Sequence, residues 1–204
     1  MREMGATTMA NDTSIARKAM IDSQLRTSGV NEEFVLARMA AIAREDYLPA
    51  DMAPLAYIDR SVALPDGGSL ASPLFYGKLL LEAAPKRDDS VLIIEGGTAY
   101  LADLIRPLVA SVATTSAAEA ASGAAADNGS FSLVLIDGAI EQLPESVAEM
   151  LEENGRIAGG VMLRKVTRLA SGRKVAGSVS LLPVEDLGIP VLSAFAAPQK
   201  WSFS

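Results

Sequence analysis

Apolar and polar positions alternate with a helical period in the first quarter of the chain. Residues 1–11 are polar and predict a flexible tail, and the polar residues 12–14 offer N-caps for a helix that runs to about Arg26. Asn31 is the expected cap of a second helix. The apolar positions that recur at helical spacing are Ile15, Ala19, Ile21 and Leu25, then Val35, Met39 and Ile42. Residues 12–50 are therefore predicted to form N-terminal helices.

From about residue 73 onward, the pattern of apolar and polar positions predicts alternating helices and strands. Residues 91–94 form a continuous apolar run, which is typical of a strand buried on both faces of a sheet. Residues 131–136 are the clearest strand, and Asp137-Gly138 is expected to turn the chain out of it. The remaining predicted strands are 61–64, 109–113, 157–163, 166–170, 175–182 and 201–203, and the predicted helices are 73–84, 99–108 and 144–155.

This order predicts an α/β fold with a mostly parallel sheet and a late antiparallel part. The length of 204 residues suits a single domain spanning residues 1–204, with its α/β core in residues 73–204. Residues 114–130 are dominated by alanine, serine and glycine, and we expect them to form a poorly specified helix or a loop.

Composition excludes several kinds of chemistry. The chain has no cysteine and no histidine, so thiol nucleophiles, Cys/His zinc sites and a Ser-His-Asp triad are ruled out, and no metal site is predicted. Reactions that need little proton transfer remain, and methyl transfer from a sulfonium is one of them. The net charge of −7 argues against a general nucleic-acid binder.

The sequence shows no convincing secretory signal and no apolar run long enough to cross a bilayer. We therefore expect a cytoplasmic protein that has no membrane partner.

Several short motifs occur in an informative order along residues 20–161. They are Met20-Ile21-Asp22-Ser23-Gln24-Leu25, Arg44-Glu45-Asp46-Tyr47-Leu48-Pro49, Ala56-Tyr57-Ile58-Asp59, Ser69-Leu70-Ala71-Ser72-Pro73, and residues 91–100, 131–137 and 151–160. As an ordered set they resemble the protein-L-isoaspartate O-methyltransferase family. Residues 91–100 align with the family's cofactor loop, Val-Leu-Glu-Ile-Gly-x-Gly-x-Gly-Tyr, and residues 69–73 align with its Thr-x-Ser-x-Pro.

The resemblance implies a Rossmann-like methyltransferase fold that uses S-adenosylmethionine. It also implies methylation of the side-chain carboxylate of damaged aspartate in isoaspartyl proteins or peptides, which starts their repair. The residues implied to bind the cofactor are Glu95, Gly96, Gly97, Thr98, Tyr100 and Asp137. Tyr57 and Asp59 are implied substrate contacts, and Asp59 is also a candidate catalytic residue. Ser72 is the second catalytic candidate, because it lies next to the position of the family's active-site serine, with an N-cap of the following helix as the alternative.

The chain departs from the family pattern at this implied site. Ile93 replaces the acid of the cofactor loop, and Glu95 and Ala99 replace two of its three glycines, which normally let the backbone approach the cofactor. Ser116 stands where the family has an acid for the ribose hydroxyls, and Ala71 aligns with its active-site serine. Residues 114–130 are also too short for the family's helix-strand-helix, so we expect that an edge strand has been lost.

Three functions therefore stay open. The first is an active carboxyl methyltransferase. The second is a non-catalytic relative that has lost cofactor binding and acts as an interaction module. The third is a nicotinamide-dependent enzyme, for which the glycine pattern is poor. A basic cluster is predicted to be a solvated face, with an anion site as the alternative; its members are Arg164, Lys165, Arg168, Arg173 and Lys174.

Overall fold

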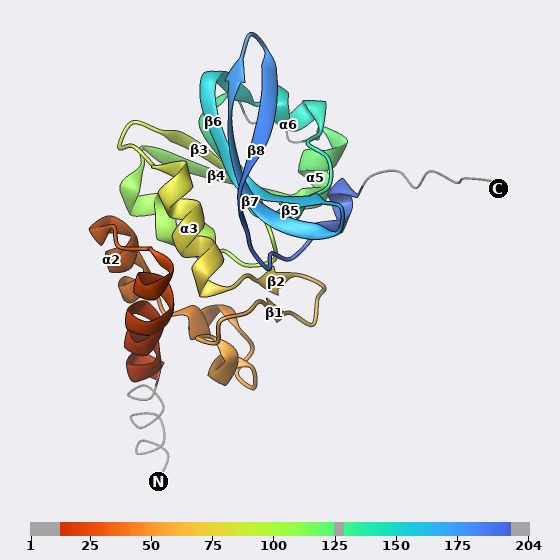
Figure 1. Cartoon of the computed structure of the whole chain (residues 1–204). Coiled ribbons are helices and arrows are strands. Elements are labelled where there is room, and N and C mark those ends of the chain that lie inside the picture. The colour runs from red at the N-terminus through yellow and green to blue at the C-terminus, as the bar shows by residue number, and fades with distance from the viewer. Residues whose placement is uncertain (1–12, 125–128, 197–204) are drawn as a thin grey trace, which may run out of the picture.

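The computed structural model describes residues 13–124 and 129–196 (Figure 1). The strands are β1 (Val62–Ala63), β2 (Ser69–Leu70), β3 (Ser90–Glu95), β4 (Ser111–Ser116), β5 (Phe131–Ile140), β6 (Leu151–Leu163), β7 (Val166–Val175) and β8 (Ser178–Asp186). The α-helices are α2 (Glu33–Ala41), α3 (Pro73–Ala83), α4 (Tyr100–Ile105), α5 (Ala117–Ser122) and α6 (Glu145–Glu149). Short helical turns are η1 (Ile21–Leu25), η2 (Arg26–Ser28), η3 (Arg44–Tyr47), η4 (Ala53–Leu55), η5 (Arg106–Leu108) and η7 (Ser193–Phe195).

Six strands form one sheet in the order β4-β3-β5-β6-β7-β8, and β1 pairs with β2 in a separate hairpin. Neighbouring strands from β4 to β6 are parallel, and the pairs β6–β7 and β7–β8 are antiparallel. The predicted α/β class, with a parallel sheet that ends in an antiparallel part, is confirmed.

Helices cover both faces of the sheet, with α3 on one face and α5 and α6 on the other (Figure 1). Side chains of β3 alternate between the two faces, because successive residues of a strand point in opposite directions. Val91 and Ile93 join a core with α3 and α4, whereas Leu92 and Ile94 join a core with α5 and α6. This arrangement explains why residues 91–94 are all apolar.

The N-terminal helices pack beside α3 and differ in detail from the prediction. Residues 13–20 are α-helical, and the chain then passes through η1 and η2 to Gly29, whose φ of 85° ends the helix as expected. Glu32, and not Asn31, is the N-cap of α2, and it makes no side-chain capping bond. The cap prediction for Asn31 is therefore wrong.

The expected turn at Asp137-Gly138 is also wrong, because β5 continues to Ile140. The Ala139 amide donates to the Pro190 carbonyl at 2.7 Å, and the Leu192 amide donates to the Ala139 carbonyl at 2.8 Å. A segment about fifty residues away thus supplies the backbone partners that keep this part extended, and the local pattern carries no sign of it.

Other boundaries differ as well. The helix predicted to run from Pro144 to Asn154-Gly155 ends at Glu149, since β6 begins at Leu151 and pairs with Phe131. β4 includes residues 114–116, and α5 lies within the segment expected to be poorly specified. The strand predicted at residues 201–203 and the tail at 1–11 lie outside the described residues.

β4 is the outermost strand of the described sheet, next to β3. Between β4 and β5 the described residues contain α5 and no further strand. This agrees with the expected loss of an edge strand. No helix in the described part of the chain is long and apolar enough to cross a membrane.

Candidate functional site

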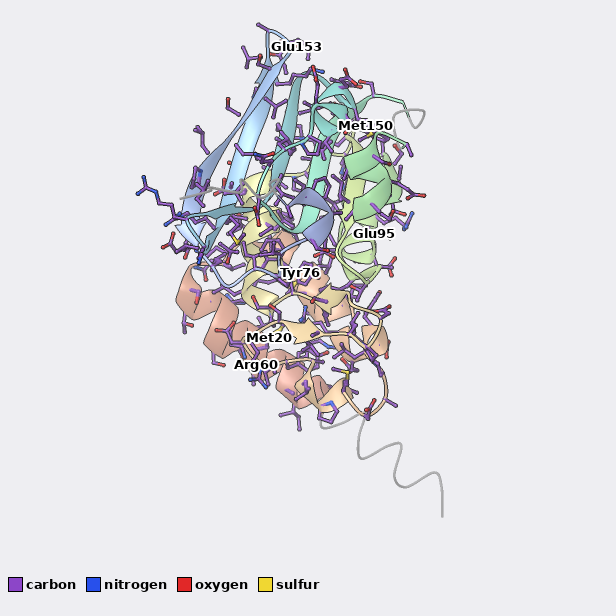
Figure 2. The ribbon with its side chains drawn as sticks, turned by 90° about the vertical axis from the view of Figure 1, so that its right-hand side faces the viewer. Met20, Arg60, Tyr76, Glu95, Met150 and Glu153 are labelled. Atoms are coloured by element: carbon purple, nitrogen blue, oxygen red, sulfur yellow. The ribbon has the colours of Figure 1, made fainter. Side chains whose placement is uncertain are left out.

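The carboxyl ends of β4, β3 and β5 meet at one edge of the sheet. Glu95 pairs in register with Ser116, and Ile94 pairs with Ile136, so Asp137 follows directly beside Glu95. Figure 2 shows Glu95 at this edge, far from Glu153 at the other end of the sheet. In open parallel sheets this edge is where ligands bind.

The glycine turn after β3 is tightly packed between β5 and the β1–β2 hairpin. A Cβ atom on Gly96 would lie 1.9 Å from the Asp137 carbonyl oxygen, and one on Gly97, whose φ is 132°, would lie 2.6 Å from Gly68 Cα. The Ser69 amide donates to the Gly96 carbonyl at 2.9 Å. Only glycine fits at residues 96 and 97, and the turn is joined through its backbone to the hairpin.

Asp137 carries a buried carboxyl group beside this turn. Its residue exposure is 2%, and neither carboxylate oxygen has a hydrogen-bond partner among the described residues. Burial raises the pKa of this carboxyl to about 7, although the Tyr76 hydroxyl, the Gly96 amide and the Arg44 charge favour its ionised form. Asp137 therefore places a buried carboxyl at the strand end, faced by the Tyr76 hydroxyl, the Gly96 amide and the Arg44 charge but without a full hydrogen bond to either oxygen among the described residues.

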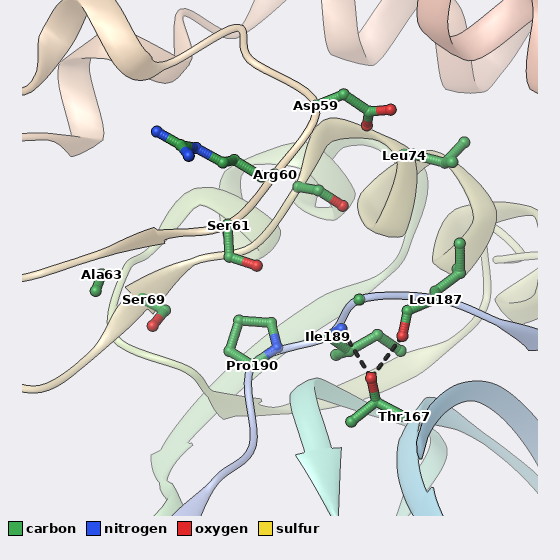
Figure 3. Close-up of a pocket in the computed structure, with 12 residues that line it drawn as sticks. Asp59, Arg60, Ser61, Ala63, Ser69, Leu74, Thr167, Leu187, Ile189 and Pro190 are labelled. Carbon is green, nitrogen blue, oxygen red and sulfur yellow. Dashed lines mark hydrogen bonds between the residues drawn. The ribbon is translucent and has the colours of Figure 1, made fainter. Parts of the chain in front are cut away.

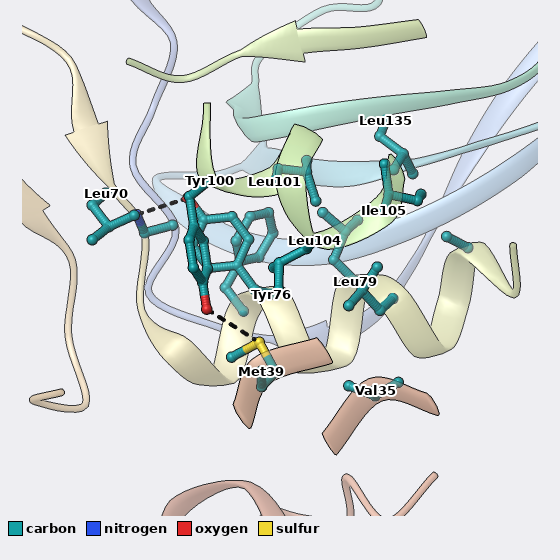
Figure 4. Packing of buried hydrophobic residues seen from close by; sticks show 14 of the residues in the cluster. Val35, Met39, Leu70, Tyr76, Leu79, Tyr100, Leu101, Leu104, Ile105 and Leu135 are labelled. Carbon is teal, nitrogen blue, oxygen red and sulfur yellow. Dashed lines mark hydrogen bonds between the residues drawn. The ribbon is translucent and has the colours of Figure 1, made fainter. Parts of the chain in front are cut away.

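Arg44 is fully buried and was not predicted to belong to the site. Its guanidinium donates to the Ala56 and Ala71 carbonyls, each at 2.7 Å, while Nη1 has no hydrogen-bond partner among the described residues. The guanidinium carbon lies 4.9 Å from the centre of the Tyr100 ring and 5.4 Å from that of Tyr76. Figure 4 shows these two rings packed together in the core. Arg44 thus fixes both the Ala56 segment and the Ala71 segment.

A cavity of about 500 Å³ lies between the β1–β2 hairpin and residues 187–190 (Figure 3). We call it the hairpin cavity. Asp59, Ser69 and Ser72 line its polar side, together with Arg60 and Ser61. Asp59 and Ser72 are the two residues predicted to be catalytic, and the structure brings both to this cavity.

Ser69 connects the hairpin cavity to the glycine turn. Ser69 lines the cavity, and its backbone amide donates a hydrogen bond to the Gly96 carbonyl. The two regions predicted to hold substrate and cofactor are therefore neighbours joined by one hydrogen bond, although Asp137 is not among the cavity-lining residues.

Ser72 also has a structural task, because its hydroxyl accepts from the Phe75 amide at 3.2 Å and caps α3. Ala71 is buried and contributes its carbonyl to Arg44. Tyr57 is joined to this region through Arg44, whose backbone amide donates to the Tyr57 hydroxyl at 3.3 Å. The same hydroxyl accepts from Arg17 Nε at 2.7 Å and donates to Glu45.

The side chains of Tyr100 and Thr98 both serve local packing. The Tyr100 ring is fully buried against Tyr47 and Tyr76, and its hydroxyl lies 3.5 Å from Met39 Sδ. Thr98 Oγ1 accepts weakly from the Tyr100 amide at 3.4 Å. These two residues can therefore reach a ligand at the glycine turn mainly through their backbone.

At the end of β4, Ser116 forms a capping box with Glu119. The Glu119 amide donates to the Ser116 hydroxyl at 3.2 Å, and the Ser116 amide donates to Glu119 Oε2 at 3.0 Å. The Ser116 amide and hydroxyl lower the pKa of the Glu119 carboxyl. A carboxylate thus stands close to the position from which the family's acid is missing.

The basic cluster is largely used within the sheet. Arg168 pairs with Asp186 at 2.6 Å, Arg173 donates to the Asn154 carbonyl at 2.7 Å, and Lys174 donates to the carbonyls of Ala148 and Leu151. These contacts agree with a solvated, sheet-stabilising role. Within the described residues, no group of three or more acidic side chains could hold a metal ion.

Sequence reasoning missed Thr167 and residues 187–190 as cavity-lining residues, because they come from the far end of the chain. Arg44 belongs to one of the family-like motifs, but its position there predicts no role for it. The sequence carries no signal of its burial, because the acidic residues Glu45 and Asp46 follow it directly and its aromatic neighbours come from distant segments.

Solved structures define the class of this fold. A Plasmodium falciparum protein-L-isoaspartate O-methyltransferase in complex with S-adenosyl-L-homocysteine superposes with a TM-score of 0.68 and 15% identity, over 87% of this chain and 98% of that one. A second structure named protein-L-isoaspartate O-methyltransferase gives a TM-score of 0.67 at 15% identity, over 87% of this chain and 66% of that one. The fold is that of the Rossmann-like methyltransferases.

Sequence comparison then identifies the family. The protein-L-isoaspartate O-methyltransferase of Koribacter versatilis is 30% identical over 196 residues, covering 85% of this chain and 88% of that protein. The protein of the same name from Methanoculleus marisnigri is 23% identical, over 88% of this chain and 92% of that protein. The one from Methylorubrum populi is 25% identical, over 84% of this chain and 96% of that protein. No family model matches the chain. The chain belongs to the protein-L-isoaspartate O-methyltransferase family.

Proposed function

We propose that this chain is an S-adenosylmethionine-dependent methyltransferase that esterifies the free carboxylate of isoaspartyl residues in proteins or peptides. The observation that carries the proposal is the hairpin cavity, which joins the glycine turn after β3 through the Ser69–Gly96 hydrogen bond. An acceptor in the cavity would lie next to a methyl donor held at the turn.

The residues present fit the amino-acid end of such a cofactor. Asp137 holds a buried carboxyl beside Gly96 whose oxygens lack a full hydrogen bond among the described residues, and an ammonium group is a natural donor for it. Glu119 places a carboxylate at the end of β4, near the position of the family's ribose-binding acid. Glu95, at the end of β3, brings negative charge close to where the cofactor's own carboxylate would lie, and this opposes binding unless its side chain points away. Glu95, Gly96, Gly97, Thr98, Tyr100 and Asp137 are therefore proposed as the cofactor site.

The cofactor supplies an electrophilic methyl group on a sulfonium. Ser72, Asp59 and the backbone around Ser69 would orient the peptide, and the cavity walls would exclude water from it. An acceptor carboxylate is already ionised at neutral pH, so the reaction needs no general base. That requirement suits a chain without histidine or cysteine.

The first test is calorimetric titration with S-adenosylhomocysteine, with thermal unfolding as a second readout. Binding to the folded state should stabilise it by about 2.7 kcal/mol at a hundredfold excess over the dissociation constant. The next assay is methyl incorporation into an isoaspartyl peptide, with the matching aspartyl peptide as control. No binding at millimolar ligand would contradict the proposal and favour the non-catalytic interaction module.

The proposed setting is the cytoplasm, with damaged proteins or peptides as partners and neither nucleic acid nor a membrane among them. The net charge of −7 supports the exclusion of nucleic acid. The chain is proposed to work as one domain over residues 1–204.

A further inference from the structure

One side chain holds the far wall of the hairpin cavity in place. Thr167 Oγ1 donates to the Leu187 carbonyl at 2.6 Å and accepts from the Ile189 amide at 3.1 Å, the two contacts drawn in Figure 3. The Leu187 amide also donates to the Thr167 carbonyl at 3.1 Å. A single threonine thus makes three hydrogen bonds to residues 187–189.

The other end of this wall is fixed by β5. Pro190 accepts from the Ala139 amide at 2.7 Å, and Ile189 is only 5% exposed and packs into the core beside α3. Residues 187–190 are therefore held from both ends, although they belong to no helix or strand.

Between these two attachments, Gly188 faces open space. A Cβ atom built on Gly188 would have no heavy atom within 4 Å, and its φ lies outside the positive region that L residues avoid. Gly188 lines the hairpin cavity. Gly188 is exposed, so a side chain at this position would add bulk at the wall of the cavity without straining the backbone.

We propose that Thr167 is a positioning residue for the peptide acceptor, and that Gly188 in the wall it holds determines which acceptors fit. The identity of the acceptor rests on the proposed function. A wall fixed before binding does not have to be ordered when the peptide arrives, and that preorganisation strengthens binding. On the other side of the cavity, the lining residue Ser72 directly follows Ala71, whose carbonyl accepts from the buried Arg44 at 2.7 Å.

The test compares Thr167→Val with Thr167→Ser in the full chain, using a fluorescent isoaspartyl peptide. Valine loses both hydroxyl contacts, so the peptide dissociation constant and KM should rise by about tenfold while kcat changes by less than about twofold. Serine keeps the hydroxyl and should restore wild-type affinity. The affinity for S-adenosylhomocysteine should not change in either variant.

Hydrogen exchange supplies a readout that is independent of catalysis. The Ile189 amide should exchange faster in Thr167→Val than in the wild type and in Thr167→Ser, because its acceptor is lost. Faster exchange together with unchanged peptide affinity would overturn the positioning role. Unchanged exchange would overturn the proposed fixation of the wall.

Gly188→Val and Gly188→Ala test the second half of the proposal. Valine should weaken peptide binding more than alanine does, with unfolding midpoints close to that of the wild type. Equal affinity in all three proteins would overturn the selecting role of Gly188. If the wild type binds the peptide but does not bind S-adenosylhomocysteine and transfers no methyl group, only the proposed methyltransferase function is refuted. If the wild type binds no peptide, the roles proposed for Thr167 and Gly188 are refuted.

Discussion

Replacing Asp137 by asparagine tests how the protein tolerates a buried carboxyl without a partner. Burial raises the pKa of this carboxyl from its ordinary value of 3.8 to about 7, and the charge of Glu95 adds to the effect. The folded state therefore holds the proton more tightly than the unfolded state does. The stability that this proton contributes is complete below pH 3.8 and is lost as the pH rises to about 7.

The size of the effect follows from that interval. Each pH unit within it changes the free energy of unfolding by about 1.4 kcal/mol, so the full loss is about 4 kcal/mol and the part between pH 5 and pH 8 is about 3 kcal/mol. Asparagine has a similar shape and no proton to release. Asp137→Asn should therefore be more stable than the wild type at pH 8 and show a smaller loss of stability between the two pH values.

Urea unfolding of both proteins at pH 5 and pH 8 measures this difference. Asp88→Asn is the matched control, because Asp88 is exposed on the surface and the same substitution there should leave the pH dependence almost unchanged. Equal losses of stability between pH 5 and pH 8 in Asp137→Asn and the wild type would refute the reasoning.

Three further substitutions test contacts described by the structure. Arg156→Met should lower the free energy of unfolding, measured by urea titration, by about 3 kcal/mol. The reason is that Asp89, which is only 4% exposed, loses its ionic partner. A loss below about 0.5 kcal/mol would contradict a buried ion pair. Gly97→Ala should destabilise more than Gly67→Ala, because both positions have positive φ and only the Cβ at Gly97 would meet other backbone atoms; equal thermal shifts would disprove the close contact. Ser116→Ala should cost about 1 kcal/mol by the same urea assay through loss of the N-cap of α5, and an unchanged midpoint would show that the cap is not needed.

The parts of the fold that could be predicted are those set by neighbouring residues. The run 91–94 gives a doubly buried strand because each of its side chains meets a core, and Ser72-Pro73 begins α3 because a hydroxyl cap and a fixed φ act locally. The turn expected at Asp137-Gly138 failed because Pro190 and Leu192 hold that backbone extended. Such long-range partners leave no trace in the local pattern.

The candidate site divides in the same way. Asp59 and Ser72 could be proposed from short motifs and do meet at the hairpin cavity. Arg44 and Thr167 could not be assigned, because the tasks of both depend on backbone carbonyls or amides that only folding brings near them. The raised pKa of Asp137 likewise follows from its burial, which the sequence alone does not determine.

The hydrogen bond from the Ser69 amide to the Gly96 carbonyl has a consequence for how the two proposed ligands would affect each other's binding. A ligand that shifts the glycine turn must also shift Ser69, which lines the neighbouring cavity. Thermodynamic linkage then requires reciprocity: if the cofactor changes the affinity for the peptide by some factor, the peptide changes the affinity for the cofactor by the same factor. Any such coupling would run through the backbone contacts between the glycine turn and the hairpin, which are this hydrogen bond and the close packing of Gly97 on Gly68.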